Sequence, residues 1–303
     1  LCHMKLQLEK EAAFLQAASS MNEEKILVVC DRGTTDCKAY MSAEDYDAAC
    51  AKLNKSEIDL RDRYDAVFHL VTAAKGAEEF YTLSNNGART ETLEQARAID
   101  DALISAWTGH PHFRVICNDT DFEGKIKKLI EEISSVLGEP EPLEIEHKYL
   151  VEYPDIAYLE SLANCRKVEI IQTYLKTDDG HEARVRQRGA DGNYIYFKTE
   201  KIRVSDIKRV EIEQRLTQKE YLAALMDADT SLRQIRKTRY CLSYGSQYFE
   251  IDIYPFWNDK AVVEVELSNE NEQVKMPEFI KVIKEVTDDR SYSNYELAKN
   301  ERI

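Results

Sequence analysis

The sequence predicts two domains of different fold class, an α/β domain followed by a domain of antiparallel β structure. Apolar, strand-like runs alternate with helical patterns before the proline-rich stretch Gly138-Glu139-Pro140-Glu141-Pro142. After that stretch, segments with strand-type alternation follow one another. Eight antiparallel strands can close a small barrel, which removes exposed edges. We therefore expect one domain over residues 1–138 and a barrel over residues 139–303.

Strands and helices alternate in the first domain, which indicates a parallel sheet. Three short apolar runs are typical of strands buried on both faces: Ile26–Cys30, Ala66–Val71 and Phe113–Cys117. Helical spacing extends over Leu6–Ala18, Thr92–Trp107 and about Asp121–Leu137. Asp119 or Thr120 is expected to cap the last of these helices.

The second domain contains eight strand candidates, separated by Gly-containing turns. They are residues 144–151, 169–176, 182–188, 194–199, 208–214, 236–243, 247–254 and 261–267. Helical patterns are expected near residues 156–163, 218–227 and 277–286.

Composition excludes several functional classes. The first glycine is Gly33, and no two glycines have the spacing of a Walker A loop before Lys-Ser or Lys-Thr. No apolar run reaches eighteen residues, and neither a membrane span nor a secretory signal is expected. The seven scattered cysteines form no C-x-x-C motif, which favours a cytoplasmic location. The net charge of −15 disfavours general binding to nucleic acid.

Charged residues recur at i, i+2 spacing along successive strands of the second domain. The charges could point outward to water, or they could line the inside of the barrel. Their recurrence on so many strands favours the inside. Carboxylates there would bind a hard divalent cation such as Mg²⁺ or Mn²⁺, and Arg and Lys would bind phosphate oxygens. A metal-complexed polyphosphate would satisfy both sets.

The segment Glu144-Ile145-Glu146-His147-Lys148 resembles the E-x-E-x-K signature of the CYTH domain, also called the triphosphate tunnel metalloenzymes. Further charged patches continue the resemblance, in order, over roughly residues 142–300. It implies an eight-stranded tunnel that binds a triphosphate with divalent metal. The implied metal ligands are Glu144, Glu146, Glu264 and Glu266, with Asp252 assigned less directly. The implied phosphate-binding residues are Lys148, Arg184, Arg186, Lys198, Lys237 and Arg239.

Glu211, Glu213 and Lys148 are the catalytic candidates implied by the same resemblance, the two glutamates as metal ligands or as residues that orient water. For each charged residue the alternative is a structural salt bridge inside the barrel. That alternative is favoured for Arg188, Arg209 and Arg215, which lie at strand ends. Three functions remain open: hydrolysis of tripolyphosphate or a nucleoside triphosphate, binding of GTP or phosphoinositide without turnover, and adenylate cyclisation.

Asp31 follows an apolar run, the position of a Walker B acid, and Arg89 and Arg97 resemble lid arginines that meet nucleotide phosphates. An ordinary turn acid and helix-surface charges are the alternatives. The pattern resembles the NadR-like, AAA-type P-loop domain that precedes a CYTH domain in the insect translocation-defect family. That resemblance implies binding of ATP or GTP and of phosphoinositide. Because the phosphate loop of that family is missing, either the chain is a fragment or the domain has lost its nucleotide site, and we expect a fragment.

Overall fold

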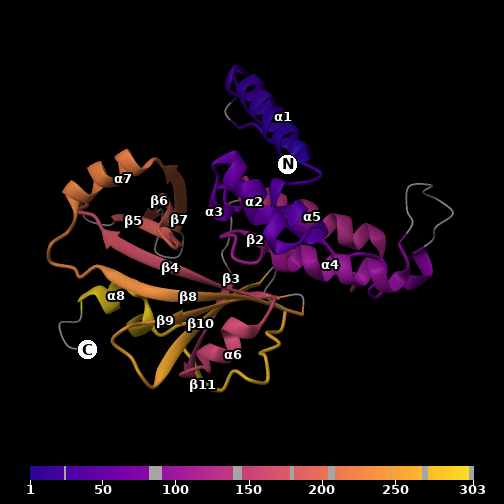
Figure 1. Cartoon of the computed structure of the whole chain (residues 1–303). Helices are drawn as coiled ribbons and strands as arrows, with labels where there is room; N and C mark the ends of the chain where they lie inside the picture. Colours follow the sequence, from indigo (N-terminus) through magenta and orange to yellow (C-terminus); the bar gives the residue numbers. More distant parts are fainter. Residues whose placement is uncertain are drawn as a thin grey trace. The chain divides into compact units, whose positions relative to one another are not determined.

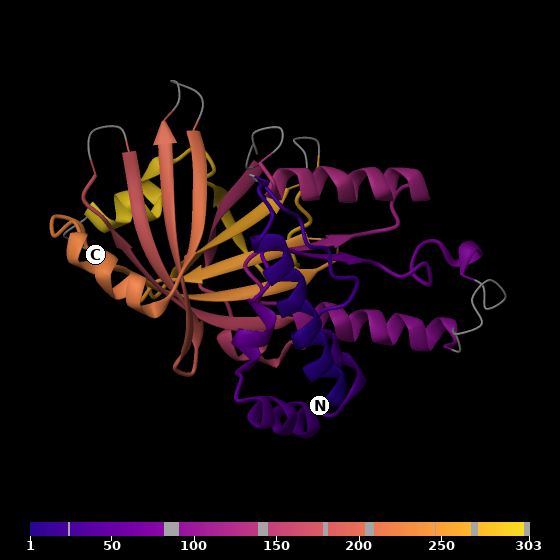
Figure 2. The ribbon, with the colours of Figure 1, turned by 90° about the horizontal axis from the view of Figure 1, so that it is seen from above.

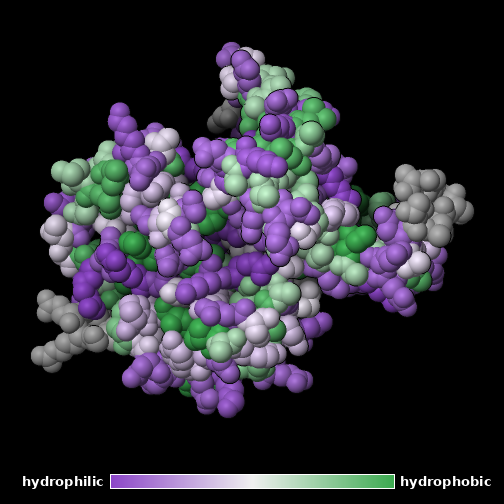
Figure 3. Space-filling view, in the orientation of Figure 1, coloured by the Kyte–Doolittle hydropathy of each residue, from purple (hydrophilic) through white to green (hydrophobic). Residues whose placement is uncertain are grey.

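A computed structural model describes residues 1–23, 25–81, 91–138, 145–177, 181–203, 209–245, 247–267 and 272–299. The chain divides into two compact units, Leu1–Glu139 and Pro140–Ile303, whose elements are labelled in Figure 1. Hydrophilic side chains cover much of the surface seen in Figure 3, with smaller apolar patches between them. Among the described residues, no helix has the length and apolar character needed to cross a membrane.

The first unit contains a parallel pair of strands with helices, as the sequence predicts. Strand β1 (Val67–Leu70) pairs with β2 (Phe113–Ile116). The helices are α1 (Cys2–Ser19), α2 (Ala43–Leu53), α3 (Glu57–Arg61), α4 (Leu93–Trp107) and α5 (Phe122–Val136), with short 3₁₀ turns η1 (Thr34–Tyr40) and η2 (Glu78–Phe80).

Side-chain caps fix where the two long predicted helices begin. Thr92 precedes α4 and forms a capping box with Gln95. Asp121 precedes α5, and its carboxylate accepts a hydrogen bond from the Gly124 amide. The cap of α5 is therefore Asp121, not Asp119 or Thr120 as predicted.

The predicted strand Ile26–Cys30 is wrong, because none of its residues forms a described strand. Leu27 and Val29 are 54% and 74% exposed. An apolar run becomes a strand only where a neighbouring strand satisfies its backbone groups, and β1 pairs with β2 alone among the described residues. Asp31 therefore follows a largely exposed segment outside the described strands, and not the end of a buried strand.

The second unit is a nine-stranded antiparallel sheet, which is strongly curved in Figures 1 and 2. The strand order is β11-β3-β10-β9-β8-β4-β5-β6-β7. The bounds are β3 (Ile145–Glu152), β4 (Cys165–Tyr174), β5 (His181–Ala190), β6 (Asn193–Arg203), β7 (Arg209–Leu216), β8 (Ile235–Tyr244), β9 (Gln247–Ile253), β10 (Lys260–Leu267) and β11 (Val282–Glu285). The first and last strands of this order, β11 and β7, do not pair with each other among the described residues. The predicted closure into a barrel is therefore not seen in the described part of the sheet.

Helices α6 (Ile156–Ser161) and α7 (Gln218–Ala224, continued by η3, Leu225–Asp227) lie where the sequence predicts them. The helix predicted near residues 277–286 is wrong, because that segment contains strand β11. Its backbone pairs with β3, and the Val286 amide next to it donates to the Lys148 carbonyl at 2.7 Å. The turn η4 (Arg290–Tyr292) and helix α8 (Asn294–Lys299) near the end of the chain were not predicted.

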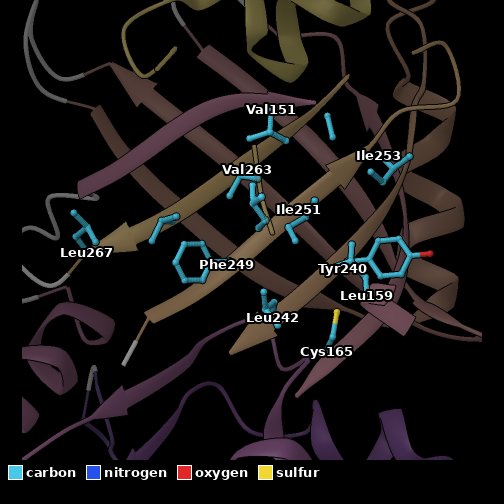
Figure 4. Packing of buried hydrophobic residues seen from close by; sticks show 13 residues of the cluster. Val151, Leu159, Cys165, Tyr240, Leu242, Phe249, Ile251, Ile253, Val263 and Leu267 are labelled. Atoms are coloured by element: carbon cyan, nitrogen blue, oxygen red, sulfur yellow. The ribbon is translucent and has the colours of Figure 1, made fainter. Parts of the chain in front are cut away.

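The sheet has two chemically different faces because side chains alternate along each strand. One face is apolar, and Figure 4 shows its side chains packed together on β3, β8, β9 and β10. Val263 and Val265 are fully buried there and flank Glu264, while Phe249 and Ile251 flank Glu250 in the same way. Glu264 and Glu250 therefore point to the opposite face, which we call the charged face.

Candidate functional site: the charged face of the antiparallel sheet

Strand register brings one group of charges together across β3, β10 and β9. Glu264 lies opposite Lys148 on one side and opposite Glu250 on the other. The Lys148 Nζ atom is 3.0 Å from Glu264 Oε1 and 3.2 Å from Glu146 Oε1. Three predicted site residues, Glu146, Lys148 and Glu264, therefore form one cluster on adjacent strands.

Arg239 on β8 connects this cluster to the next strand. Its Nη2 atom lies 2.7 Å from Glu264 Oε2, and its Nη1 atom donates to Glu250. The register places Arg239 opposite Asp252, and the two form a bidentate pair with both N–O distances at 2.6 Å. Arg239 is thus on the predicted face, with donors directed at three carboxylates.

The position of Asp252 does not suit its predicted role as a metal ligand. Its side chain is 0% exposed, and Lys237 Nζ donates to the same oxygen that Arg239 Nη2 contacts. A carboxylate needs a free lone pair directed at an accessible ion to bind a metal, and here cations surround it. The sequence pattern Glu250–Asp252 could not distinguish a ligand from the partner of a buried cation.

Burial and neighbouring charges shift the pKa values of Glu264, Lys148 and Lys237. Although burial raises the pKa of Glu264, the charges of Lys237, Arg239 and Lys148 hold it well below its usual range. Burial lowers the pKa of Lys148, but Glu264 and Glu146 outweigh this effect and the net pKa is raised. Burial, with Arg239 repulsion, lowers the pKa of Lys237 against the opposing effect of Asp252.

A second group of charges lies on β5, β6 and β7. Arg184 and Thr199 are opposite one another across the β5–β6 pair, and Thr199 is opposite Glu213 on β7. The Thr199 hydroxyl donates to Glu213 Oε2 at 3.2 Å, and Arg186 Nη1 lies 3.7 Å from the same oxygen. Burial, followed by the charge of Arg184, lowers the pKa of Arg186. Arg184, Arg186 and Glu213 therefore share the charged face, as predicted.

Lys198 lies on the wrong face for its predicted role. It is opposite Val185, which is fully buried in the apolar cluster under α7, and its Nζ atom pairs with Glu200 Oε1 at 2.6 Å. The reason is the hairpin register: the turn Asp191-Gly192, with φ of 53° and 81°, pairs Ala190 with Asn193. Counting residue pairs from this turn places Thr199 opposite Arg184 on the charged face. Thr199 is not among the site residues predicted from the sequence, but the turn signal identifies it.

Arg188, whose predicted role is structural, lies on β5. It is 2% exposed, and its Nη2 atom donates to Cys241 Sγ at 3.7 Å. The backbones of Arg209 and Arg215 belong to β7.

Two predicted residues of this site cannot be placed. Glu144 lies outside the described residues, and so does the side chain of Glu211, whose backbone belongs to β7. Within the described part, no three His, Cys, Asp or Glu side chains are grouped so that they could hold a metal ion. Glu146 and Glu266 are direct partners across β3 and β10, and the Glu146 side chain is 38% exposed. Their carboxylates are hard oxygen donors, so this pair fits a divalent cation of the Mg²⁺ or Mn²⁺ type.

The predicted nucleotide site in the first unit is not assembled among its described residues. Arg97 donates from Nε to the Ala74 carbonyl at 2.5 Å and from Nη2 to Glu78 at 2.9 Å, so it links α4 to the loop after β1. Asp31 is exposed, and Arg89 lies outside the described residues.

Buried charges in this unit have structural partners instead. Asp100 accepts bonds from the Thr72 amide and Lys75 Nζ, and it pairs with His69, each at 2.9 Å. Burial opposes the charge of Asp100, but bonds from His69 and Lys75 lower its pKa to about 2. Lys125 donates to the Val71 carbonyl at 2.6 Å and to Asn118 at 2.7 Å. These bonds fix the loop that follows β1.

Comparison with known proteins gives a match for each unit. The family model of the CYTH domain matches residues 142–288, and that of an AAA domain matches residues 2–125. Among solved structures, the inorganic triphosphatase NE1496 is 30% identical over 53% of this chain and 97% of its own, with a TM-score of 0.38. The PH1012 protein from Pyrococcus horikoshii OT3 is 20% identical over 42% of this chain and 80% of its own, with a TM-score of 0.32. No curated protein matches the chain.

Proposed function

Because residues 142–288 form a CYTH domain after an AAA-type domain at residues 2–125, we propose that the chain binds and hydrolyses a triphosphate on its charged face. The substrate is inorganic tripolyphosphate or a nucleoside triphosphate, bound with Mg²⁺ or Mn²⁺. The observation that carries this proposal is the gathering of cations and carboxylates from six strands, β3, β10, β9, β8, β5 and β7, on one face. A polyanion complexed with a divalent cation complements both kinds of charge.

Phosphate oxygens would be bound by the cations of this face. Arg184 and Arg186 offer planar guanidinium groups on β5, and Lys148 and Lys237 offer ammonium groups on β3 and β8. Glu146 and Glu266, with Glu144, would hold the divalent cation. When bound, that cation neutralises charge on the phosphate oxygens.

Glu213 is the residue that we propose to orient the attacking water. Thr199 donates to Oε2 of its carboxylate, and the arginine pair lies on the same side. The water attacks the terminal phosphorus, the phosphoanhydride bond breaks, and orthophosphate is released with pyrophosphate or a nucleoside diphosphate. Since the charge is spread over phosphate oxygens in the transition state, fixed cations around them supply most of the acceleration.

A second candidate function is recognition of GTP or phosphoinositide without turnover. The AAA-type match favours it, because domains of that type bind nucleotides. Against it, Arg97 is already bonded within its own unit and Asp31 is exposed in a loop. Adenylate cyclisation is the third candidate, and no observation here favours it.

One experiment separates these functions. The full chain is incubated with tripolyphosphate, ATP or GTP in the presence of Mg²⁺ or Mn²⁺, and orthophosphate, pyrophosphate and cyclic nucleotide are measured. Hydrolysis predicts orthophosphate from wild type and its loss in Glu146→Gln. The control is Glu285→Gln, which removes a half-exposed carboxylate that pairs with His147 on the opposite face of β3. Cyclic nucleotide would establish the cyclase, and phosphoinositide binding without any turnover would refute the hydrolase.

A further inference from the structure

We infer that Asp252 is a positioning residue for Lys237 and Arg239, and not a ligand of the divalent cation. This inference rests on the proposed function, since it assigns a role within the same charged face. Two cations on the neighbouring strand β8, Lys237 and Arg239, direct donors at the two oxygens of Asp252.

Both oxygens of Asp252 are engaged by cations. Oδ1 accepts from Arg239 Nε at 2.6 Å. Oδ2 accepts from Arg239 Nη2 at 2.6 Å and also from Lys237 Nζ. A carboxylate offers about four lone-pair sites, and three of these are used here. A metal ion at the remaining lone pair would have to lie in a buried position beside two cations, which would repel it.

Burial separates Asp252 from the carboxylates that could bind a metal. Its side chain is 0% exposed, whereas the side chain of Glu146 is 38% exposed. The register also places Asp252 opposite Val262, which is fully buried. Asp252 therefore lies at the apolar end of the charged face, and solvent or a solvated ion reaches Glu146 more readily.

The buried carboxylate of Asp252 fixes the position of the Lys237 ammonium group. Its ammonium group donates one hydrogen bond to Asp252 and lies 5.7 Å from the centre of the Tyr254 ring. Two of its three N–H donors are left for other acceptors. Without the Asp252 charge, Lys237 and Arg239 would repel one another in a buried setting, and neither would keep its position. Asp252 thus holds Lys237 ready for a phosphate chain, with Arg239 fixed beside it.

The test is a kinetic comparison of two conservative variants in the full chain. Asp252→Asn should raise the KM for tripolyphosphate by about tenfold or more, because hydrogen bonds to charged groups are lost, and leave the Mg²⁺ half-saturation within about twofold of wild type. Glu266→Gln should instead raise the Mg²⁺ half-saturation by about tenfold. A rise in Mg²⁺ half-saturation for Asp252→Asn equal to that for Glu266→Gln would overturn the inference.

A double-mutant cycle with Lys237→Gln supplies the second measurement. If Asp252 acts through Lys237, the double variant should have a KM no higher than the worse single variant, since the two changes remove one interaction. Additive effects on KM would contradict that role. If Asp252→Asn fails to fold by circular dichroism, the double variant removes two of the buried charges together, and its Mg²⁺ half-saturation is still expected to match wild type.

The wild-type chain distinguishes failure of the inference from failure of the proposed function. If wild type hydrolyses tripolyphosphate, the variants test Asp252 alone. If wild type does not, the hydrolase proposal fails, and the dissociation constant for tripolyphosphate replaces KM in the same comparison. Weakened binding in Asp252→Asn then supports the positioning role, and unchanged binding refutes it.

Discussion

Both units bury charged side chains, but these side chains have different kinds of partner in the two units. In the first unit, Asp100 and Lys125 bond to backbone groups and close neighbours around a single loop. In the second, residues such as Lys148, Arg186 and Arg239 come from separate strands and point to one common face. Burial of charge alone therefore does not identify a site. Recurrence of charge across neighbouring strands, on a face shared with exposed carboxylates, is the more informative observation.

The largest expected effect tests the charged face directly. Arg186→Ala should lower kcat/KM for tripolyphosphate by on the order of 100-fold, because one fixed donor to the developing phosphate charge is removed. Phosphate release by the full chain at several substrate concentrations measures the effect. Arg97→Ala in the first unit is the matched control and should leave kcat/KM unchanged. A decrease of less than threefold for Arg186→Ala would show that β5 does not contact the substrate.

The corresponding change in the first unit should affect stability and leave turnover intact. Asp100→Asn removes the charge that His69 and Lys75 share, and we expect a loss of roughly 3 kcal/mol in the free energy of unfolding of that unit. Urea unfolding followed through the fluorescence of buried Trp107 measures it, in a Trp257→Phe background that removes the tryptophan of the second unit. A loss of tripolyphosphate hydrolysis with unchanged stability would contradict the structural role.

The sequence predicts the second unit better than the first for a physical reason. Period-2 alternation records which face of each strand is buried, so Val263 and Val265 indicate the direction of Glu264 without knowledge of the pairing. The apolar run Ile26–Cys30 contains no information about whether a neighbouring strand exists to pair with it. The strand β11 depends in the same way on β3, which lies more than a hundred residues earlier in the chain.

The details of the site were harder to predict than its location. Asp252 and Glu146 have the same chemistry and spacing in the sequence, and only the three-dimensional contacts show that one is enclosed by cations and the other is accessible. The face of Lys198 depends on a two-residue turn, where an error of one residue reverses the direction of every side chain. Thr199 has no charge pattern of its own, and only the register set by the Asp191-Gly192 turn places it beside the arginines.

The pH dependence of the first unit should follow the histidine that it buries completely. His110 accepts a bond from the His112 amide at Nδ1 and donates from Nε2 to the Tyr64 carbonyl, so it is neutral. Burial lowers its pKa from 6.5 to about 3. Below pH 6.5 the unfolded chain binds a proton that the folded unit does not. Stability is therefore full above pH 6.5 and falls by about 1.4 kcal/mol per pH unit toward pH 3.

Urea unfolding of the Trp257→Phe chain at pH 7 and pH 5 measures this slope through Trp107. His110→Gln lowers the stability at pH 7 but should flatten the dependence, because the titrating group is gone. If the slope between pH 7 and pH 5 is the same in both proteins, another group is responsible and His110 is not the source.

The smallest expected effect provides the sharpest test of strand register, because it compares adjacent residues on opposite faces of β6. Lys198 pairs with Glu200 near the surface, where the side chains are 35% and 41% exposed, and such pairs contribute little. Lys198→Ala should therefore change kcat/KM for tripolyphosphate by less than about twofold. Thr199→Val, which removes the donor to Glu213, should lower kcat by roughly tenfold, and Thr199→Ser should restore most of it. The reverse result, a large effect at Lys198 and none at Thr199, would mean that β6 pairs with β5 one residue out of the register seen here.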